Sequence, residues 1–215
     1  MRHKAENSVS KNKILLEAFK LFASKPFEKV TFADLEKATG LSRGAILYHI
    51  QTKENLFEMV LENLIFKRST IVSNDNIVGL WNHIEDFIQE RIKEQEDFSS
   101  SAIANVNKAF FNIECSAFSC SDKMADFATS WVEKELANWI KLLNNAIEAK
   151  EIKSDIDVVA YAHIFMNIFM GASYIGVGLP NGYDIENMKK QYRYLYDQIK
   201  RHCPKFCVNG NRIQL

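Results

Sequence analysis

The sequence TGLSRGAILYHIQTKENLF, residues 39–57, places a glycine turn between two short segments with helical spacing. Gly40 can adopt the left-handed conformation that ends a helix, and the Ser42 hydroxyl can accept a hydrogen bond from the first amides of the next helix. Ile46 and Ile50 then follow on one helical face, where they can pack inward. A glycine turn of three or four residues between two short helices is the helix-turn-helix arrangement.

The flanking residues extend this pattern in both directions. Helical spacing predicts helices over 10–24, 31–39 and 42–50, and a fourth that begins at Lys53. Thr31 is the expected N-cap of the second helix, with Asp34 where a capping box places an acid, and Thr52 is the expected N-cap of the fourth. These four segments form the expected head, residues 1–57.

The rest of the chain reads as long amphipathic helices with short polar breaks. Eight Gly and three Pro are few for 215 residues with fifteen Phe, which favours long helices over a many-stranded sheet. The expected fold is all-α with about nine helices, with a helical body over 58–202 and a C-terminal tail over 203–215. The body helices are expected at 77–95, 99–117, 122–150, 155–178 and 184–202.

Charge is unevenly distributed, although the net charge of the chain is zero. Residues 1–53 contain ten Lys or Arg and five Asp or Glu, a net charge of +5, so the remainder carries −5. A basic head on an acidic body is typical of a protein that binds a polyanion through its head. Ordinary solvated helix faces would also give this distribution.

The sequence favours a cytoplasmic protein without a metal or a membrane span. The first thirteen residues lack the apolar segment of a secretory signal. The four cysteines are too few and too unevenly placed to form a disulfide framework, Cys115 and Cys120 do not share a helical face, and HCPKFC, residues 202–207, lacks zinc spacing. The apolar run over 156–179 contains Asp157, which favours a buried helix.

Residues 14–57 resemble the DNA-binding domain of TetR-family transcriptional regulators. The resemblance rests on an ordered set at family spacing: Ile14, Ala18, Leu21-Phe22, Phe27, Val30-Thr31, Asp34-Leu35, Thr39-Gly40-Leu41-Ser42, Arg43-Gly44, His49, Lys53-Glu54 and Leu56. Two positions depart from the family pattern. Leu47 stands where an aromatic, usually Tyr, is expected, and Ile50 stands where Phe is usual. Tyr48, one position further on, is a possible replacement for that tyrosine, and Leu47 can instead contact a thymine methyl group.

The resemblance implies that the third helix enters the major groove of double-stranded DNA. On that face Arg43 can reach a guanine edge or a phosphate, Gly44 permits close approach of the backbone, and Lys53 has the family position of a phosphate contact. The complete predicted DNA-binding set is Thr31, Ser42, Arg43, Gly44, Leu47, Tyr48, His49 and Lys53. Each of them is also tolerable as a surface residue.

The resemblance further implies that the C-terminal body binds a small effector and forms a homodimer through its last two helices. The aromatic residues proposed to line the effector site are Trp81, Phe110, Phe111, Trp131, Trp139, Phe165 and Phe169. The residues proposed for the dimer interface are His163, Met166, Met170, Tyr174, Tyr192 and Leu195. At helical spacing, each of these side chains is alternatively part of an ordinary core.

These features predict a non-enzymatic, ligand-responsive regulator that binds a near-palindromic operator as a homodimer, most readily a repressor released by a small apolar or aromatic effector. No phosphate-binding loop, nucleophile elbow or paired-histidine motif is present, and no cofactor is expected. Three alternatives remain: a transcriptional activator of the same fold, a small-molecule-binding helical protein with a vestigial head, and a protein-interaction module.

Overall fold

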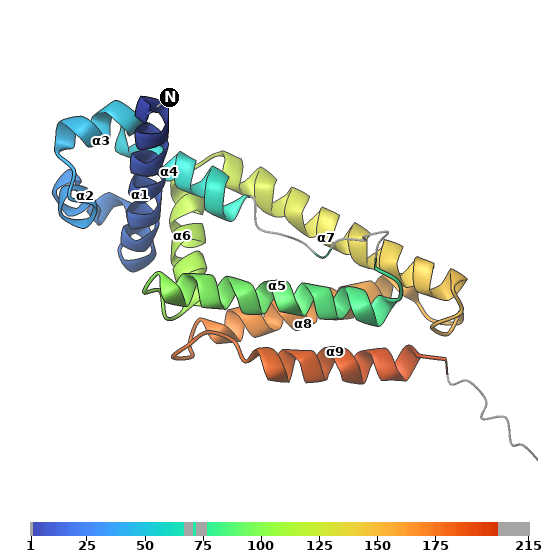
Figure 1. The fold of residues 1–215 in the computed structure, drawn as a ribbon. Helices are drawn as coiled ribbons and strands as arrows, with labels where there is room; N and C mark the ends of the chain where they lie inside the picture. Colours follow the sequence, from blue (N-terminus) through green and yellow to red (C-terminus); the bar gives the residue numbers. More distant parts are fainter. Residues whose placement is uncertain (1, 67–70, 72–76, 202–215) are drawn as a thin grey trace, which may run out of the picture.

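The computed structural model describes residues 2–66, 71 and 77–201. Figure 1 shows a small head formed by the first four helices, an upright helix α6 beneath it, and a body of long helices that run away from the head. No β-strand is found within the described residues, and one antiparallel bridge joins Ile152 to Lys200. The all-α prediction is confirmed. The predicted tail 203–215 and the whole segment HCPKFC, residues 202–207, lie outside the described residues.

The head consists of four α-helices with a 3₁₀ turn and a π-helical turn. They are α1 (Arg2–Ser24), η1 (Phe27–Lys29), α2 (Phe32–Thr39), α3 (Arg43–Ile50), α4 (Lys53–Val60) and the π-helical η2 (Leu61–Ile65). The first helix begins eight residues before the predicted start, because neither Gly nor Pro interrupts the segment 2–10.

The predicted caps set the angles between these short helices. Gly40 ends α2 with φ 68°, a left-handed conformation in which a side chain would be strained. The hydroxyl of Ser42 accepts from the amide of Ala45 at 3.3 Å, and α3 begins there. At α2 the capping box is complete, since Thr31 and Asp34 each accept a hydrogen bond from the other's amide.

The body consists of five further helices. They are α5 (Leu80–Ser100), α6 (Val106–Cys120), α7 (Lys123–Glu148), α8 (Val158–Gly176) and α9 (Ile185–Ile199). Among the body helices, the largest departure from the predicted bounds is the start of α6, seven residues later than expected. Ala102 lies there at φ 63°, and Asn105 supplies the N-cap by accepting from the amide of Lys108 at 2.8 Å.

The buried apolar side chains form two clusters, and α6 contributes to the one in the head. The head cluster joins Phe19 and Phe22 of α1 to Phe110, Ile113 and Ala117 of α6. Asn112 of α6 also donates a hydrogen bond to the carbonyl oxygen of Ala23 at 2.7 Å. The core of the head is therefore incomplete without a helix that lies almost fifty residues further along the chain.

The second cluster joins α5, α7, α8 and α9 and contains a buried carboxylate. Trp139, Phe165 and Tyr192 stack at its centre with ring planes 12–18° apart. Glu135, 2% exposed, accepts hydrogen bonds from the Trp139 indole at 3.1 Å and from the amide of Ile71 at 3.0 Å. Burial raises the pKa of Glu135 to about 7, although both hydrogen bonds act in the opposite direction.

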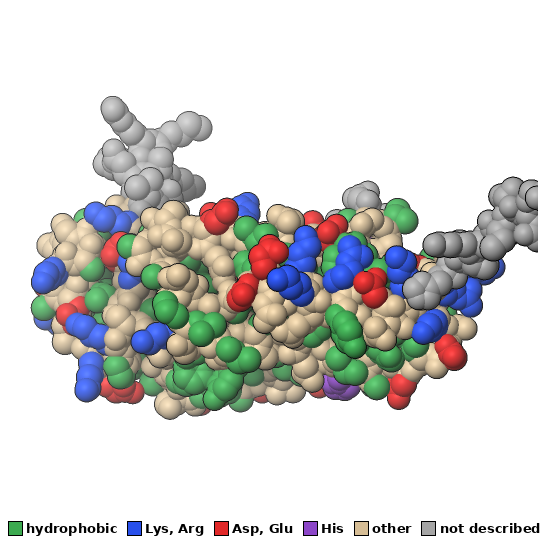
Figure 2. Space-filling view, turned by 90° about the horizontal axis from the view of Figure 1, so that it is seen from below, with side chains coloured by type: hydrophobic (Ala, Val, Ile, Leu, Met, Phe, Trp, Pro, Cys, Tyr) green, Lys and Arg blue, Asp and Glu red, His purple; other side chains and the backbone are tan. Residues whose placement is uncertain are grey.

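Helix α8 is buried on one face only, in contrast to the predicted buried helix. It is the one helix of the described residues that is long and apolar enough to cross a membrane by length and composition, and 22% of that window is buried. Its exposed apolar side chains are Val159, Ile164, Met170, Tyr174 and Ile175. Figure 2 shows hydrophobic side chains gathered along one edge of the body.

Candidate DNA-binding surface and effector cavity

The outward face of α3 presents polar and aromatic side chains next to Gly44, where no side chain covers the backbone. Arg43 and Gly44 are exposed, and a Cβ atom built at Gly44 would have no neighbour within 4 Å. Tyr48 is 75% exposed and packs edge-on against His49, with 5.2 Å between the ring centroids. On the opposite face, Ile46 is fully buried. The helix is thus anchored on one side and open to a partner on the other.

Arg43 is held at the start of α3 by two residues of α2. Its backbone amide donates to a Glu36 carboxylate oxygen at 2.7 Å, which satisfies one of the amides left unpaired at a helix start. Its guanidinium carbon lies 4.8 Å from the centroid of the Phe32 ring. This stacking restricts the arginine side chain while leaving its N–H groups available on the exposed side.

The exposed start of α2 is held in place by a small hydrogen-bonded group. The Thr31 hydroxyl donates to Asp34 at 2.8 Å, and the Lys25 ammonium donates to the same carboxylate at 2.7 Å. These hydrogen bonds, with that of Lys25 the largest, hold the pKa of Asp34 well below its usual value. Thr31 and Ser42 therefore serve as helix caps at the exposed edge of the head, where the predicted phosphate contacts lie.

Leu47 occupies the position of α3 where the family usually has an aromatic residue, and the phenol ring of this chain stands one position later, at Tyr48. Leu47 is half-buried, whereas Tyr48 extends into solvent. The hydroxyl of Tyr48 is consequently accessible to a phosphate, and Leu47 offers only apolar contact at the edge of the same face.

Lys53 makes contacts that sequence reasoning missed. Its ammonium donates to the carbonyl oxygens of Phe27 and Val30 at 3.0 and 3.1 Å, and it lies 4.4 Å from the centroid of the Phe27 ring. Both carbonyls border the 3₁₀ turn that leads into α2. An ammonium group has three N–H donors, and these two carbonyls occupy two of them. The third N–H of Lys53 could donate a hydrogen bond to a phosphate.

We expect Lys53→Met to lower both stability and the salt dependence of DNA binding. Loss of two charge-assisted hydrogen bonds should cost about 1–2 kcal/mol in the free energy of unfolding, measured by urea denaturation. Loss of a phosphate contact should also reduce the slope of log K against log[salt] by about one per half-site. An unchanged slope with lowered stability would show that Lys53 only supports the turn.

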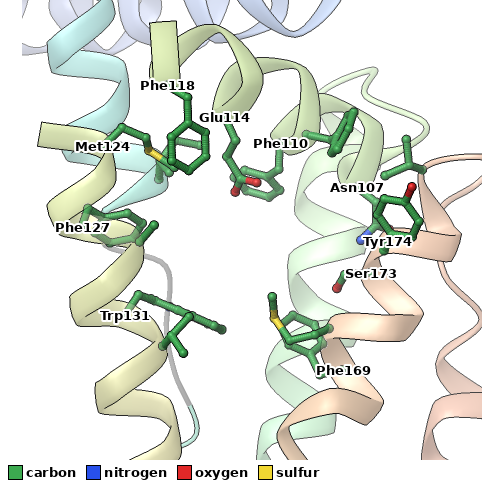
Figure 3. A pocket seen from close by; sticks show the side chains of 16 residues that line it. Asn107, Phe110, Glu114, Phe118, Met124, Phe127, Trp131, Phe169, Ser173 and Tyr174 are labelled. Carbon is green, nitrogen blue, oxygen red and sulfur yellow. The ribbon is translucent and has the colours of Figure 1, made fainter. Parts of the chain in front are cut away.

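The body contains a cavity of about 240 Å³ bounded by α6, α7 and α8. In Figure 3, Trp131 of α7 and Phe169 of α8 face each other across it, and Phe110 and Glu114 extend into it from α6. Its lining is mostly apolar, with seven aromatic side chains among sixteen residues and a few polar groups, as is usual for small-molecule sites. The residues that line it are Ile65, Asn107, Phe110, Phe111, Glu114, Phe118, Met124, Phe127, Ala128, Trp131, Val132, Phe169, Met170, Ser173, Tyr174 and Val177.

Four of the seven aromatic residues predicted to line the effector site do line this cavity, namely Phe110, Phe111, Trp131 and Phe169. The other three lie elsewhere. Trp139 and Phe165 are fully buried in the stack with Tyr192, and Trp81 packs 5.6 Å from Tyr196 under the guanidinium of Arg193.

Sequence reasoning missed several residues of the cavity, among them Glu114, Phe118 and Phe127. They come from α6 and α7, whose faces converge only in the folded chain. The signal available was the spacing of Phe110, Glu114 and Phe118, which repeats every four residues and places all three on one face of α6.

The structure separates the six residues proposed for the dimer interface. His163, Met170 and Tyr174 lie on the exposed face of α8, and Leu195 is half-buried against the body core. Met166 and Tyr192 are instead buried within this chain, at 8% and 0% exposure. Helical spacing identified the apolar residues of α8 but could not separate its two faces, since apolar side chains lie on both.

Comparison with known proteins matches the head to a described family. Residues 14–60 match the family described as "Bacterial regulatory proteins, tetR family". The match places the head of the chain, over these residues, in the TetR family. The matched segment runs from the core of α1 to the end of α4 and so contains the whole α3 surface described above. The sequence-based recognition of a TetR-family head is confirmed.

Two curated relatives each match about a third of the chain. It is 39% identical over 69 residues to the HTH-type transcriptional repressor AcnR of Corynebacterium glutamicum, covering 32% of this chain and 37% of the relative. It is 31% identical over 70 residues to the HTH-type transcriptional repressor Rv1474c of Mycobacterium tuberculosis, covering 33% and 37%. The match thus spans little more than a third of the length of either relative.

Solved structures extend the similarity in fold to almost the whole chain. TylP, a TetR regulator from Streptomyces fradiae, covers 90% of this chain and 88% of its own at a TM-score of 0.53 and 18% identity. NalD of Pseudomonas aeruginosa is the secondary repressor of the MexAB-OprM multidrug efflux pump. Its similarity covers 90% of this chain and 98% of NalD, with a TM-score of 0.60 and 15% sequence identity. The similarity to a putative transcriptional regulator of the TetR/AcrR family covers 88% of this chain and 100% of that regulator, with a TM-score of 0.64 and 13% sequence identity. At these identities the comparison establishes the TetR-type fold of head and body.

Proposed function

We propose that this protein is a transcriptional regulator, most readily a repressor, that binds a near-palindromic operator in double-stranded DNA as a homodimer. The observation that carries the proposal is the exposed face of α3, where Arg43, Gly44 and Tyr48 project from a helix whose other face is fully buried. A helix presented in this way fits the major groove. The role is a binding role, without cofactor or catalysis, in the bacterial cytoplasm and away from the membrane.

The proposed division of labour assigns residues 1–57 to DNA binding, 58–202 to effector binding and dimerisation, and 203–215 to a tail. The proposed DNA contacts are those predicted from the sequence, with Thr31 and Ser42 acting also as caps. The exposed apolar face of α8, with Met170 and Tyr174, supports dimerisation by an isologous four-helix contact that includes α9. Two heads related by a two-fold axis would read half-sites about one helical turn apart or slightly more.

Effector binding in the cavity would alter DNA binding through α6. One face of this helix lines the cavity with Phe110 and Glu114, and another holds α1 through Asn112. At the start of α7, the Lys123 ammonium lies 3.3 Å from a carboxylate oxygen of Glu58 and 3.0 Å from one of Glu62. These ion pairs connect α7, which forms one wall of the cavity, to α4 and η2. An apolar or aromatic effector that favours one position of α6 would change the spacing of the two heads and release the operator.

The proposal is tested by measuring affinity for DNA from the gene's own upstream region as salt is raised. Fluorescence anisotropy with the full chain should give a log–log slope of about −5 or steeper, since a dimer with six or more phosphate contacts releases that many counterions. A scrambled duplex should bind more weakly. Absence of binding at low salt, or a flat response, would contradict the proposal.

The alternatives predict different outcomes in the same assays. A helical protein with a vestigial head would bind ligand, and Arg43→Ala with Tyr48→Ala would change no measured property. An interaction module would retain a protein and no DNA in pull-down. An activator would bind the same operator, and deletion of its gene would lower rather than raise transcription of the neighbouring genes.

A further inference from the structure

We infer that the cavity between α6, α7 and α8 binds an apolar ligand that carries one uncharged carbonyl group, as in a ketone, an ester or an amide. The inference rests on the proposed function, since it names the chemical class of the effector at the same site. It follows from two hydrogen-bonding side chains of the lining, Asn107 and Ser173, at the contact between α6 and α8.

Asn107 lies in the first turn of α6, and its amide group is held in one orientation. The residue is 4% exposed, and its Oδ1 atom accepts a hydrogen bond from the amide of Tyr183 at 3.1 Å. Because the oxygen is occupied, the amide nitrogen with its two N–H donors is the end that a ligand can meet. Figure 3 shows this side chain at the end of the cavity where α6 approaches α8.

Ser173 of α8 supplies a second group at the same end of the cavity. Its hydroxyl oxygen is buried and has no hydrogen-bond partner among the described residues. Gly176, one turn further along α8, lies against Asn107, since a Cβ atom built there would be 2.9 Å from Asn107 Oδ1. Residues three apart on a helix are neighbours, about 5–6 Å between Cβ atoms, so Asn107 and Ser173 can contact one ligand atom.

A carbonyl oxygen fits this pair of side chains. It has two lone pairs, so it can accept from the Asn107 amide and from the Ser173 hydroxyl, and it brings no donor that needs a partner of its own. A buried hydroxyl without a partner is costly, and an accepting ligand removes that cost. None of the described residues of the lining is Lys, Arg or His, so no basic side chain there would neutralise a carboxylate. The accepting group is therefore uncharged.

The remainder of the lining accommodates the apolar body of the ligand. Phe127 and Trp131 of α7 and Phe169 of α8 provide aromatic surface, and the thioethers of Met124 and Met170 adapt to the shape of what they contact. The cavity of about 240 Å³ suits one ring with a short chain rather than a large multi-ring compound.

The test uses three ligands of one shape. They are 5-phenylpentan-2-one, the alkene in which a methylene group replaces its carbonyl oxygen, and 4-phenylbutanoate, in which an oxygen replaces its terminal methyl group. A cavity without donors would prefer the alkene, because a carbonyl loses its hydrogen bonds to water on burial. Equilibrium dialysis with the full-length protein should instead show that the ketone binds at least as tightly as the alkene, and that the carboxylate binds about tenfold or more weakly than the ketone.

A clear preference for the alkene or for the carboxylate would overturn the inference, as would no binding of the ketone at millimolar concentration.

Matched variants assign the preference to the two side chains. Ser173→Ala should lower the ratio of ketone affinity to alkene affinity by about threefold to tenfold and leave affinity for the alkene unchanged. Asn107→Asp keeps an oxygen for the Tyr183 amide, loses both N–H donors and should lower the same ratio. Ser130→Ala makes the serine change at an exposed position of α7 outside the cavity and should bind as wild type does. Circular dichroism checks that each variant is folded. An unchanged ratio in folded Ser173→Ala would overturn the inference.

A DNA-release assay separates this inference from the proposed function. If the ketone binds in a Ser173-dependent manner but leaves the operator complex intact, the cavity takes this ligand class and the proposed effector role is wrong. If the alkene or the carboxylate binds in the cavity and releases DNA while the ketone does neither, the proposed function stands and the inference is overturned.

Discussion

Replacement of Arg43 by alanine should weaken operator binding by about 1–3 kcal/mol per half-site, or about 5- to 150-fold, and relax the base preference at one position of each half-site. The expected cause is the loss of a bidentate contact from a guanidinium already restricted by its stacking on Phe32. Anisotropy titrations against an operator library with every base at each position would measure both effects.

The variant Arg43→Lys is the matched control, because it keeps the positive charge and removes the planar fork. We expect it to retain most of the salt slope while losing the base preference. If Arg43→Ala weakens binding equally to every sequence, or if lysine restores full specificity, Arg43 contacts phosphate rather than a base.

The second large effect is expected in the pH dependence of stability. Burial raises the pKa of Glu135 to about 7 from the ordinary value of 4.5, so the folded chain binds a proton through a range in which the unfolded chain has released it. The free energy of unfolding should therefore fall as pH rises, by about 2–3 kcal/mol between pH 5 and 8. The contribution of Asp34, whose pKa is lowered, is lost only at more acidic pH, below this range.

Urea denaturation at a series of pH values, with wild type compared with Glu135→Gln, would measure this contribution. Glutamine has nearly the same shape and cannot titrate, so the variant should lose the pH-dependent part and show a flatter profile. Glu133→Gln, two residues away on the exposed side of α7, should keep the wild-type profile. Parallel profiles for wild type and Glu135→Gln would show that Glu135 does not titrate in this range.

The sequence predicted those features that depend on neighbouring residues. The cap at Ser42 and the left-handed turn at Gly40 are interactions within a few residues, and the structure contains them as expected. The inward position of Ile46 and Ile50 follows equally from helical periodicity. These local features were sufficient to predict the helix-turn-helix and its outward face.

Features that depend on contacts between distant segments could not be predicted. Trp131 and Trp139 lie eight residues apart on α7, yet one lines the cavity and the other is fully buried in the stack with Phe165 and Tyr192. Their spacing alone does not say which neighbouring helix each meets. The Lys53 ammonium likewise reaches carbonyls more than twenty residues away, and no sequence pattern marks that contact.

The packing of α6 into the core of the head limits how the DNA-binding domain can be rearranged. Phe19 of α1 is fully buried, and its ring lies 5.8 Å from that of Phe110 on α6. A chimera that joins residues 1–57 to the body of another regulator would replace the surface on which α1 rests. Exchange of operator specificity between such proteins should therefore succeed when only the exposed residues of α3 are transplanted, and fail when the head is moved as a cassette.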